Sequence, residues 1–297
     1  NYTYQTALFG TEAIKSLVEK IGIYERRFAK PDVCASDLCY AAAKQLLDDN
    51  KVDTNEINLL IFISVSPDYK FPPTATLLQD RLGLGCGTIA FDITMGCSAV
   101  LYGLHVAYSM LQAPGMKKAL VLIGDTNSRI YSPEDRTSAY IFGDAGTAML
   151  IEKSEKYGES HFSINTDGAC GDFIMQPAGG SRMPSSQETL ESRVVDQAWM
   201  KGGEVLQLVI SHVPSDIKSL MAYAEENKDT IDYLLLHQAN AYMNNYLSKK
   251  LKFETVKVPT SLPKFGNTGG ASIPLTMVTE LRDTLGSGTH TLLLSAF

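Results

Sequence analysis

The sequence has few cysteines and lacks the spacing that would join them into a structural framework. The five cysteines among 297 residues are odd in number and include no Cys-x-x-Cys pair. This pattern argues against a disulfide framework and against a zinc site, and it favours a reducing compartment. We therefore expect a cytoplasmic protein without a metal centre.

Positive charge and long apolar runs are also scarce. Lys and Arg number 26 against 33 Asp and Glu, so the net charge is −7 and nucleic acid is not an expected partner. No uninterrupted apolar run approaches the roughly 20 residues that a membrane-spanning helix requires. Hydrophobic residues nevertheless make up 44% of the chain and charged residues only 20%, which predicts a substantial buried core.

Apolar runs typical of buried strands alternate with helical stretches, which predicts an α/β architecture. In the first half we expect strands at residues 59–64, 88–93 and 119–124, and helices near 74–82 and 98–111. The second half repeats this order, with strands at 231–236, 256–258 and 291–295 and helices at 241–251 and 271–285.

The two halves are also related in sequence. Residues 57–62 align with residues 231–236, so a duplicated β/α unit is the simplest account. We place the boundary within residues 153–156, which gives halves of 1–154 and 155–297. Two related halves packed together bring the carboxyl ends of both sets of strands around one crevice, a usual site for chemistry in α/β sheets.

Cys97 is the candidate nucleophile. A predicted strand ends just before it, Gly96 permits a sharp turn, and a helix follows. A thiol at a helix N-terminus is expected to have a lowered pKa, and the backbone N–H groups there can stabilise an oxyanion. The alternative is a small buried hydrophobe, which is our interpretation of the other four cysteines, Cys34, Cys39, Cys86 and Cys170.

Two polar clusters in the second half are candidates for partners of Cys97. His237 follows three leucines at a strand end, where it is either a catalytic imidazole or part of a helix-capping cluster with Asn240 as the N-cap. Asn267 is flanked by glycines that let the backbone turn tightly and bring its carboxamide near a ligand, although an ordinary capping loop has the same composition. Asp125 and Asp144, beside glycines at strand ends, are interpreted as turn-forming residues.

Cys97, then His237-Gln238-Ala239-Asn240, then Gly266-Asn267-Thr268 together resemble the β-ketoacyl-acyl-carrier-protein synthase III family of the thiolase fold. Further similar segments lie at residues 22–27, 71–74, 135–136, 141–146 and 295–297. The resemblance implies two similar β/α halves in α-β-α-β-α layers and a homodimer. It also implies a decarboxylating β-ketoacyl synthase of fatty acid or polyketide biosynthesis.

The resemblance assigns roles to the candidate residues. Cys97 would take up an acyl group from a primer thioester. His237 and Asn267 would hydrogen-bond the malonyl thioester carbonyl and stabilise the enolate formed as CO₂ leaves. Phe71, Arg136 and Gly203 would contact substrate. No cofactor is implied beyond the phosphopantetheine or coenzyme A that the substrates carry.

The expected protein partner is an acyl carrier protein. Lys249, Lys250 and Lys252 form a basic cluster where it would dock, although lysines at a helix end also complement the helix dipole. Ala241-Tyr242 stands where relatives that use coenzyme A often have an arginine, which favours carrier-bound primers. Two alternatives remain open: a thioester hydrolase or acyltransferase that acts without condensation, and a binding-only subunit of a polyketide system.

Overall fold

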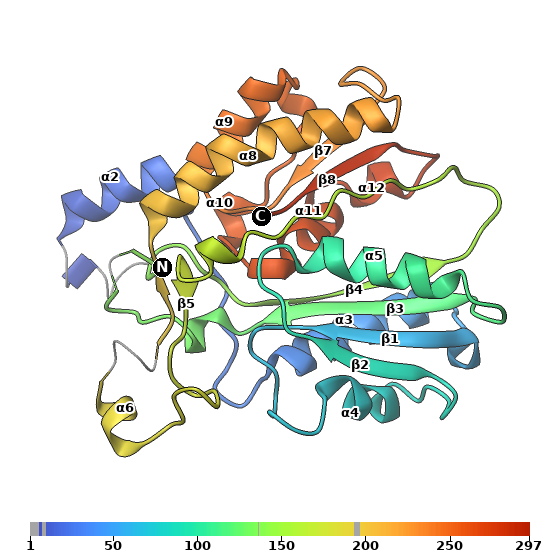
Figure 1. Ribbon diagram of the computed structural model, residues 1–297, viewed down its shortest axis with the longest axis horizontal. Coiled ribbons are helices and arrows are strands. Elements are labelled where there is room, and N and C mark those ends of the chain that lie inside the picture. The colour runs from blue at the N-terminus through green and yellow to red at the C-terminus, as the bar shows by residue number, and fades with distance from the viewer. Residues whose placement is uncertain (1–5, 8–9, 136, 193–196) are drawn as a thin grey trace.

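The computed structural model describes residues 6–7, 10–135, 137–192 and 197–297 (Figure 1). The strands are β1 Ile57–Ile63, β2 Ile89–Ile93, β3 Lys118–Asp125, β4 Ala145–Glu152, β5 Ile174–Met175, β6 Trp199–Met200, β7 Tyr233–Leu236 and β8 Leu292–Ser295. The helices are α2 Thr11–Ile21, α3 Ala35–Asp49, α4 Thr74–Arg81, α5 Ala99–Leu111, α6 Gln187–Glu191, α8 Gly202–Tyr223, α9 Ala241–Leu251, α10 Leu262–Phe265, α11 Ser272–Glu280 and α12 Arg282–Leu285. Short 3₁₀ turns are η1 Thr54–Glu56, η2 Asn127–Arg129, η3 Gly168–Cys170, η4 Thr255–Lys257 and η5 Gly269–Ala271.

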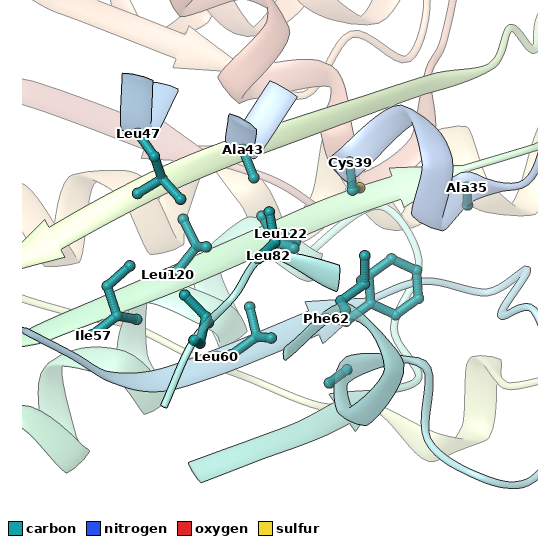
Figure 2. Packing of buried hydrophobic residues seen from close by; sticks show 13 residues of the cluster. Ala35, Cys39, Ala43, Leu47, Ile57, Leu60, Phe62, Leu82, Leu120 and Leu122 are labelled. Carbon is teal, nitrogen blue, oxygen red and sulfur yellow. The ribbon is translucent and has the colours of Figure 1, made fainter. Parts of the chain in front are cut away.

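The first half is built on a four-stranded sheet in the order β2-β1-β3-β4. Strand β1 pairs in parallel with β2 and β3, and β4 joins β3 antiparallel. Because side chains alternate along a strand, Leu60 and Phe62 pack toward α3 and α4 (Figure 2), while Leu59 and Ile61 pack toward α5. Each fully buried side chain of this kind stabilises the fold by about 1.5–3 kcal/mol.

The second half continues the layering. Strands β7 and β8 pair in parallel, with Leu235 packed in the same cluster as α5 and α11. Its neighbours Leu234 and Leu236 pack in the cluster formed with α8 and α9. The order of layers is therefore α3 and α4, the first sheet, α5 and α11, the β7-β8 sheet, then α8 and α9 (Figure 1). The predicted thiolase-like fold with α-β-α-β-α packing is confirmed.

Some local predictions differ from the structure. Residues 255–257 form the 3₁₀ turn η4 instead of a strand, and Val256 in its middle is 77% exposed. The helix expected at 271–285 is divided into η5, α11 and α12, because the backbone leaves helical geometry at Leu281, where φ is −127°. Strand β4 and helix α8 were not predicted. The division into halves at 154/155 stays a prediction; residues 153–156 lie in the loop after β4. In the described part of the chain, no helix combines the length and apolarity needed to cross a bilayer.

Candidate active site

Cys97 lies in the strand–turn–helix segment that the sequence predicted. Strand β2 ends at Ile93, the Ala99 N–H donates to the Gly96 carbonyl at 3.0 Å, and α5 begins at Ala99. Ser98 is the N-cap residue, so Cys97 precedes the helix by two positions and is half-buried. The side chain therefore emerges at the carboxyl end of the first sheet.

The predicted lowering of the Cys97 pKa is wrong. Burial raises the pKa of the thiol to about 12, and the Asp125 carboxyl adds to that rise, while the backbone N–H of Cys97 itself lowers it. The physical reason is that one N–H and a helix that starts two residues later do not offset desolvation and a neighbouring negative charge. The resting site consequently holds a thiol, whose proton must leave when the acyl group is taken up.

His237 follows β7 directly and is almost completely buried, with 1% of its surface exposed. Its backbone N–H donates to the Ser295 carbonyl at 2.8 Å, and its ring lies edge-on to Phe297 with 5.6 Å between centroids. Burial lowers the pKa of the imidazole to about 4, so His237 is neutral at physiological pH. Asn240 is the N-cap of α9, and its side chain accepts the Met243 N–H at 2.9 Å. The catalytic role of His237 stays a prediction.

The tautomer of His237 depends on its hydrogen bond to Ser272. Ser272 Oγ lies 2.7 Å from His237 Nδ1 and accepts the Gln238 N–H at 3.3 Å. The serine hydroxyl has one proton and two lone pairs, so either atom of the Ser272–His237 pair can be the donor. When the hydroxyl donates to Nδ1, the imidazole proton is on Nε2 and Nε2 is a neutral donor.

Asn267 is oriented in a comparable way. Its backbone is fixed against Phe142 in an isolated bridge, with Asn267 N–H donating to Ile141 O and Asn267 O accepting from Gly143 N–H, each at 2.9 Å. Its side-chain Oδ1 accepts the Gly269 N–H at 2.9 Å. Because the carbonyl side of the amide is held by the loop, the Nδ2 group is left to donate to a ligand.

The loop of residues 267–272 carries Asn267 and contacts the segments on which Cys97 and His237 lie. A Cβ atom added at Gly270 would lie 2.9 Å from the Gly96 carbonyl oxygen and 2.5 Å from the Ala99 Cβ, so this loop packs directly on the Cys97 turn. At its other end, Ser272 binds His237. Residues distant in the sequence thus meet where β2 and β7 end, as a shared strand edge predicts.

The other predicted site residues that the structure describes are exposed at the surface. Phe71 is 85% exposed, Gly203 is exposed in the first turn of α8, and Lys249, Lys250 and Lys252 are exposed at the C-terminal end of α9. Position 136, predicted to contact substrate, lies outside the described residues.

Two surface grooves adjoin predicted contact positions. A groove of about 420 Å³ between α2 and residues 137–140 is lined by residues that include Lys20 and Thr137. A groove of about 260 Å³ beside α8 includes Glu204, the neighbour of Gly203. Neither of these two grooves is lined by Cys97, His237 or Asn267.

The sequence did not indicate two residues near the site, and the burial predicted for Cys86 was wrong. Ser272 and Asp125 were not assigned to the site, and the interpretation of Asp125 as a turn residue is wrong, because it ends β3 and is 1% exposed. Asp125 could have been recognised from its position, because it is a polar residue at the end of a buried strand and lies at the same sheet edge as Cys97. Cys86 was expected to be buried and is exposed, since it lies in the loop between α4 and β2.

The sequence matches known proteins of one family. The family model for 3-oxoacyl-[acyl-carrier-protein (ACP)] synthase III matches residues 91–168, and the model for its C-terminal domain matches residues 221–297. The β-ketoacyl-[acyl-carrier-protein] synthase III of Alkalilimnicola ehrlichii is 34% identical over 280 residues, which are 94% of this chain and 85% of that protein. That of Caldanaerobacter subterraneus subsp. tengcongensis is 34% identical over 262 residues, 88% of this chain and 78% of the relative. The chain belongs to the 3-oxoacyl-[acyl-carrier-protein] synthase III family.

Solved structures agree with this family. The crystal structure of a 3-oxoacyl-(acyl-carrier protein) synthase from Burkholderia xenovorans LB400 matches with a TM-score of 0.92 and 34% identity, and the match covers 99% of this chain and 85% of that one. The β-ketoacyl-[acyl carrier protein] synthase III of Thermus thermophilus matches with a TM-score of 0.83 and 27% identity over 94% of this chain and 85% of that one. The resemblance seen in the sequence is confirmed, and with it a β-ketoacyl synthase, an acyltransferase of the condensing class.

Proposed function

We propose that this protein joins an acyl group, held as a thioester on Cys97, to a malonyl unit carried by an acyl carrier protein, in fatty acid or polyketide biosynthesis. The observation that carries the proposal is the 267–272 loop, which packs on the Cys97 turn and binds His237 through Ser272. This contact supports a site in which an acyl-accepting thiol acts together with two neutral donors. Membership of the synthase III family supports the same reaction.

The residue types suit a decarboxylation. When the malonyl carboxylate leaves as CO₂, the electron pair of the broken C–C bond moves into the thioester and places negative charge on its carbonyl oxygen. Nε2 of His237 and Nδ2 of Asn267 donate to that oxygen. A histidine with a pKa of about 4 stabilises the enolate without protonating the carbanion that must attack.

Condensation then completes the cycle. During acylation the Cys97 thiol proton passes to the thiolate of the departing primer carrier. The malonyl-derived carbanion then attacks the carbonyl carbon of the acyl-Cys97 thioester, a C–C bond forms, and the Cys97 sulfur leaves as a thiolate that takes up a proton from solvent. The thioester carbonyl of the substrate is the electron sink. The proposed reaction therefore needs no metal or redox cofactor, and the phosphopantetheine arm belongs to the substrate.

The two half-reactions can be tested separately. The enzyme is incubated with an acyl thioester and analysed by intact mass, and malonyl-carrier protein labelled at its free carboxyl is then added. Stoichiometric acylation followed by CO₂ release and a 3-oxoacyl product is expected. Acyl transfer or hydrolysis that continues without malonyl substrate and releases no CO₂ would instead favour a hydrolase or acyltransferase, and the absence of acylation would favour a binding-only subunit.

Carrier-bound primers are expected to be the better primers, and Lys249, Lys250 and Lys252 are the proposed docking cluster. Their support is exposure and charge on an acidic protein of net charge −7. The lysine cluster lies at the C-terminal end of α9. The N-cap of the same helix is Asn240, three residues after His237. The 11-residue helix therefore separates the cluster from the site by about 16 Å. The 420 Å³ groove lined by Lys20 and Thr137 is the proposed place where a primer's phosphate end contacts the protein, because Lys20 supplies a positive charge there.

We further propose that two copies assemble through the β2 edge. Strand β2 is the end strand of its sheet, and Ile89 on it is 45% exposed. An apolar strand edge of this kind pairs readily with a second copy about a two-fold axis. Phe71 is 85% exposed in the single chain, which supports a position against the partner copy, where it would line the acyl pocket.

A cytoplasmic location completes the proposal. All five cysteines are free thiols, and Cys97 must remain reduced for acylation. A reducing compartment maintains that state.

A further inference from the structure

Asp125 is a buried acid beside the candidate nucleophile. It ends β3, is 1% exposed, and lies close enough to Cys97 to raise the pKa of the thiol. A carboxyl group in this environment must be hydrogen-bonded, because burying an unpaired charge is strongly unfavourable. Its Oδ1 accepts from Ser64 Oγ at 3.0 Å and from Val65 N–H at 2.8 Å, both at the end of β1.

The second carboxyl oxygen faces the loop that follows Asn267. A Cβ added at Gly269 would lie 2.8 Å from Asp125 Oδ2, and one added at Gly270 would lie 2.9 Å from the Gly96 carbonyl oxygen. The Gly270 N–H also stabilises the charged carboxylate. The glycine pair therefore fills the space between Asp125 and the Cys97 turn, with no room for a side chain.

We propose that Asp125 is a positioning residue for condensation: its carboxylate holds the Gly269-Gly270 backbone against the Cys97 turn and so fixes the Asn267 donor relative to the acyl group on Cys97. This inference rests on the proposed function. Asp125 acts through Asn267, whose Oδ1 is bound by the Gly269 N–H. A displacement of about 1 Å in such a loop lowers a rate by roughly 10²-fold.

The Asp125 carboxylate is proposed to support decarboxylation, but it makes Cys97 less reactive. Its negative charge disfavours the Cys97 thiolate. Removal of the charge should therefore make the thiol more reactive while it weakens decarboxylation. A residue with a general structural role would damage both activities together, so the opposite responses identify a positioning role.

Asp125→Asn is the direct test, because it preserves shape while replacing one acceptor oxygen by an NH₂ group. In the acylated enzyme we expect CO₂ release from malonyl-carrier protein to fall about 10- to 100-fold. Alkylation of Cys97 by iodoacetamide at pH 8 should rise about three- to tenfold, as expected for a pKa decrease of half to one unit. The alkylation is followed by mass on the Cys97 peptide, because Cys86 is exposed and also reacts.

Gly270→Ala displaces the loop from its other side and leaves the carboxylate in place. Its added Cβ would meet Ala99 at 2.5 Å and the Gly96 carbonyl oxygen at 2.9 Å, so CO₂ release should fall without the rise in Cys97 alkylation that is expected of Asp125→Asn. Asp92→Asn is the matched control. Asp92 accepts the N–H groups of Thr74 and Ala75, each at 2.7 Å, at the start of α4. Its loss should lower stability without changing the ratio of CO₂ release to acylation.

The pH profile gives an independent measurement. Burial raises the pKa of Asp125 to about 7. The titratable side chains near it are Cys97, Cys39 and Tyr131, and burial raises the pKa of each, so all three are neutral at pH 7. CO₂ release by the acylated enzyme should therefore decrease as the pH falls through about 7 and Asp125 takes up a proton, and this inflection should be absent in Asp125→Asn.

The outcomes separate the two proposals. If the acylated native enzyme releases no CO₂ from malonyl substrate, the proposed function fails. If the native enzyme releases CO₂ and both Asp125→Asn and Gly270→Ala retain the native ratio of decarboxylation to acylation, the positioning role is overturned. If Asp125→Asn does not fold, Gly270→Ala decides the question, because native CO₂ release by that variant would show that the loop contact is not needed.

Discussion

Ser272 Oγ lies 2.7 Å from Nδ1 of His237, and this contact joins the second-half strand β7 to the loop that carries Asn267. The hydroxyl accepts the Gln238 N–H, and we propose that it donates its own proton to Nδ1, which holds the imidazole proton on Nε2. Ser272, shortly after Asn267 in the chain, thus orients the imidazole of His237, which follows strand β7.

Ser272→Ala should reduce decarboxylation about tenfold while leaving Cys97 acylation unchanged, because the His237 proton is then shared between both nitrogens. Ser261→Ala is the matched control, since Ser261 Oγ forms a buried 2.7 Å bond with Thr276 Oγ1. The removal of either hydroxyl should lower stability by about 1 kcal/mol, so a decarboxylation loss in both variants would contradict the tautomer assignment.

The same assignment predicts a pH response. Burial lowers the pKa of His237 from its ordinary 6.5 to about 4, so between these two pH values the unfolded chain binds a proton at this residue and the folded chain does not. Stability supplied by this group is present above pH 6.5 and is lost as the pH falls toward 4. Nitrogen-15 spectra of labelled histidine should show His237 neutral, with its proton on Nε2, at pH 5.5. A protonated imidazole at that pH would refute the argument.

Loss of either donor should separate the two half-reactions. In His237→Ala and in Asn267→Ala, acylation of Cys97 should stay within roughly tenfold of the native enzyme, and CO₂ release should fall by about 10²–10³. The double variant should be little worse than either single one, since both donors serve one oxygen. Radiolabelled CO₂ release and intact mass are the measurements. Equal damage to both steps would make His237 a general base for Cys97.

One acyl adduct is expected, and Cys97→Ala should abolish it. Cys97 is the thiol that lies beside the 267–272 loop, whereas Cys86 is exposed on the surface. Cys86→Ala is the control and should leave both the adduct and turnover intact. Intact-mass analysis after exposure to acyl thioesters decides the question, and an adduct that persists in Cys97→Ala would assign the chemistry to another cysteine.

Charge reversal at Lys249 and Lys250 should raise the KM for malonyl-carrier protein severalfold or more. Turnover at saturation and reaction with a small pantetheine thioester should change little, because remote charges affect encounter. The effect should shrink in 1 M salt, where the Debye length is about 3 Å. The control is a charge reversal of the same size at Lys15 and Lys44, which are exposed on α2 and α3, and it should leave this KM unchanged. An unchanged KM would leave the cluster as a solvated helix end.

Ile89→Glu should convert the proposed dimer into monomers, because it places a charge on the unpaired β2 edge. Tyr223→Glu is the control: Tyr223 is 76% exposed at the end of α8, away from this edge. Sedimentation at several concentrations measures both variants. A native protein that sediments as a monomer, or an Ile89→Glu variant that remains dimeric, would exclude assembly through β2.

Much of the site was predictable because it depends on local sequence. The Gly96-Cys97 turn lies between a strand and a helix whose apolar patterns are clear, and His237 directly follows three leucines that form a buried strand. Helix α8 and strand β4 were missed. Pro214 interrupts the helical pattern of α8, and β4 begins with small residues that carry little strand signal.

The sequence by itself determined the chemical groups, their order along the chain and the strand ends from which they emerge. Tertiary structure alone decided their protonation and their partners. Cys97 has a raised pKa and His237 a lowered one because burial opposes charge, and burial depends on how distant strands pack. Likewise, Asp125 meets Gly269 and Ser272 meets His237 only because the two sheets enclose α5 and α11 between them, a contact that no local pattern contains.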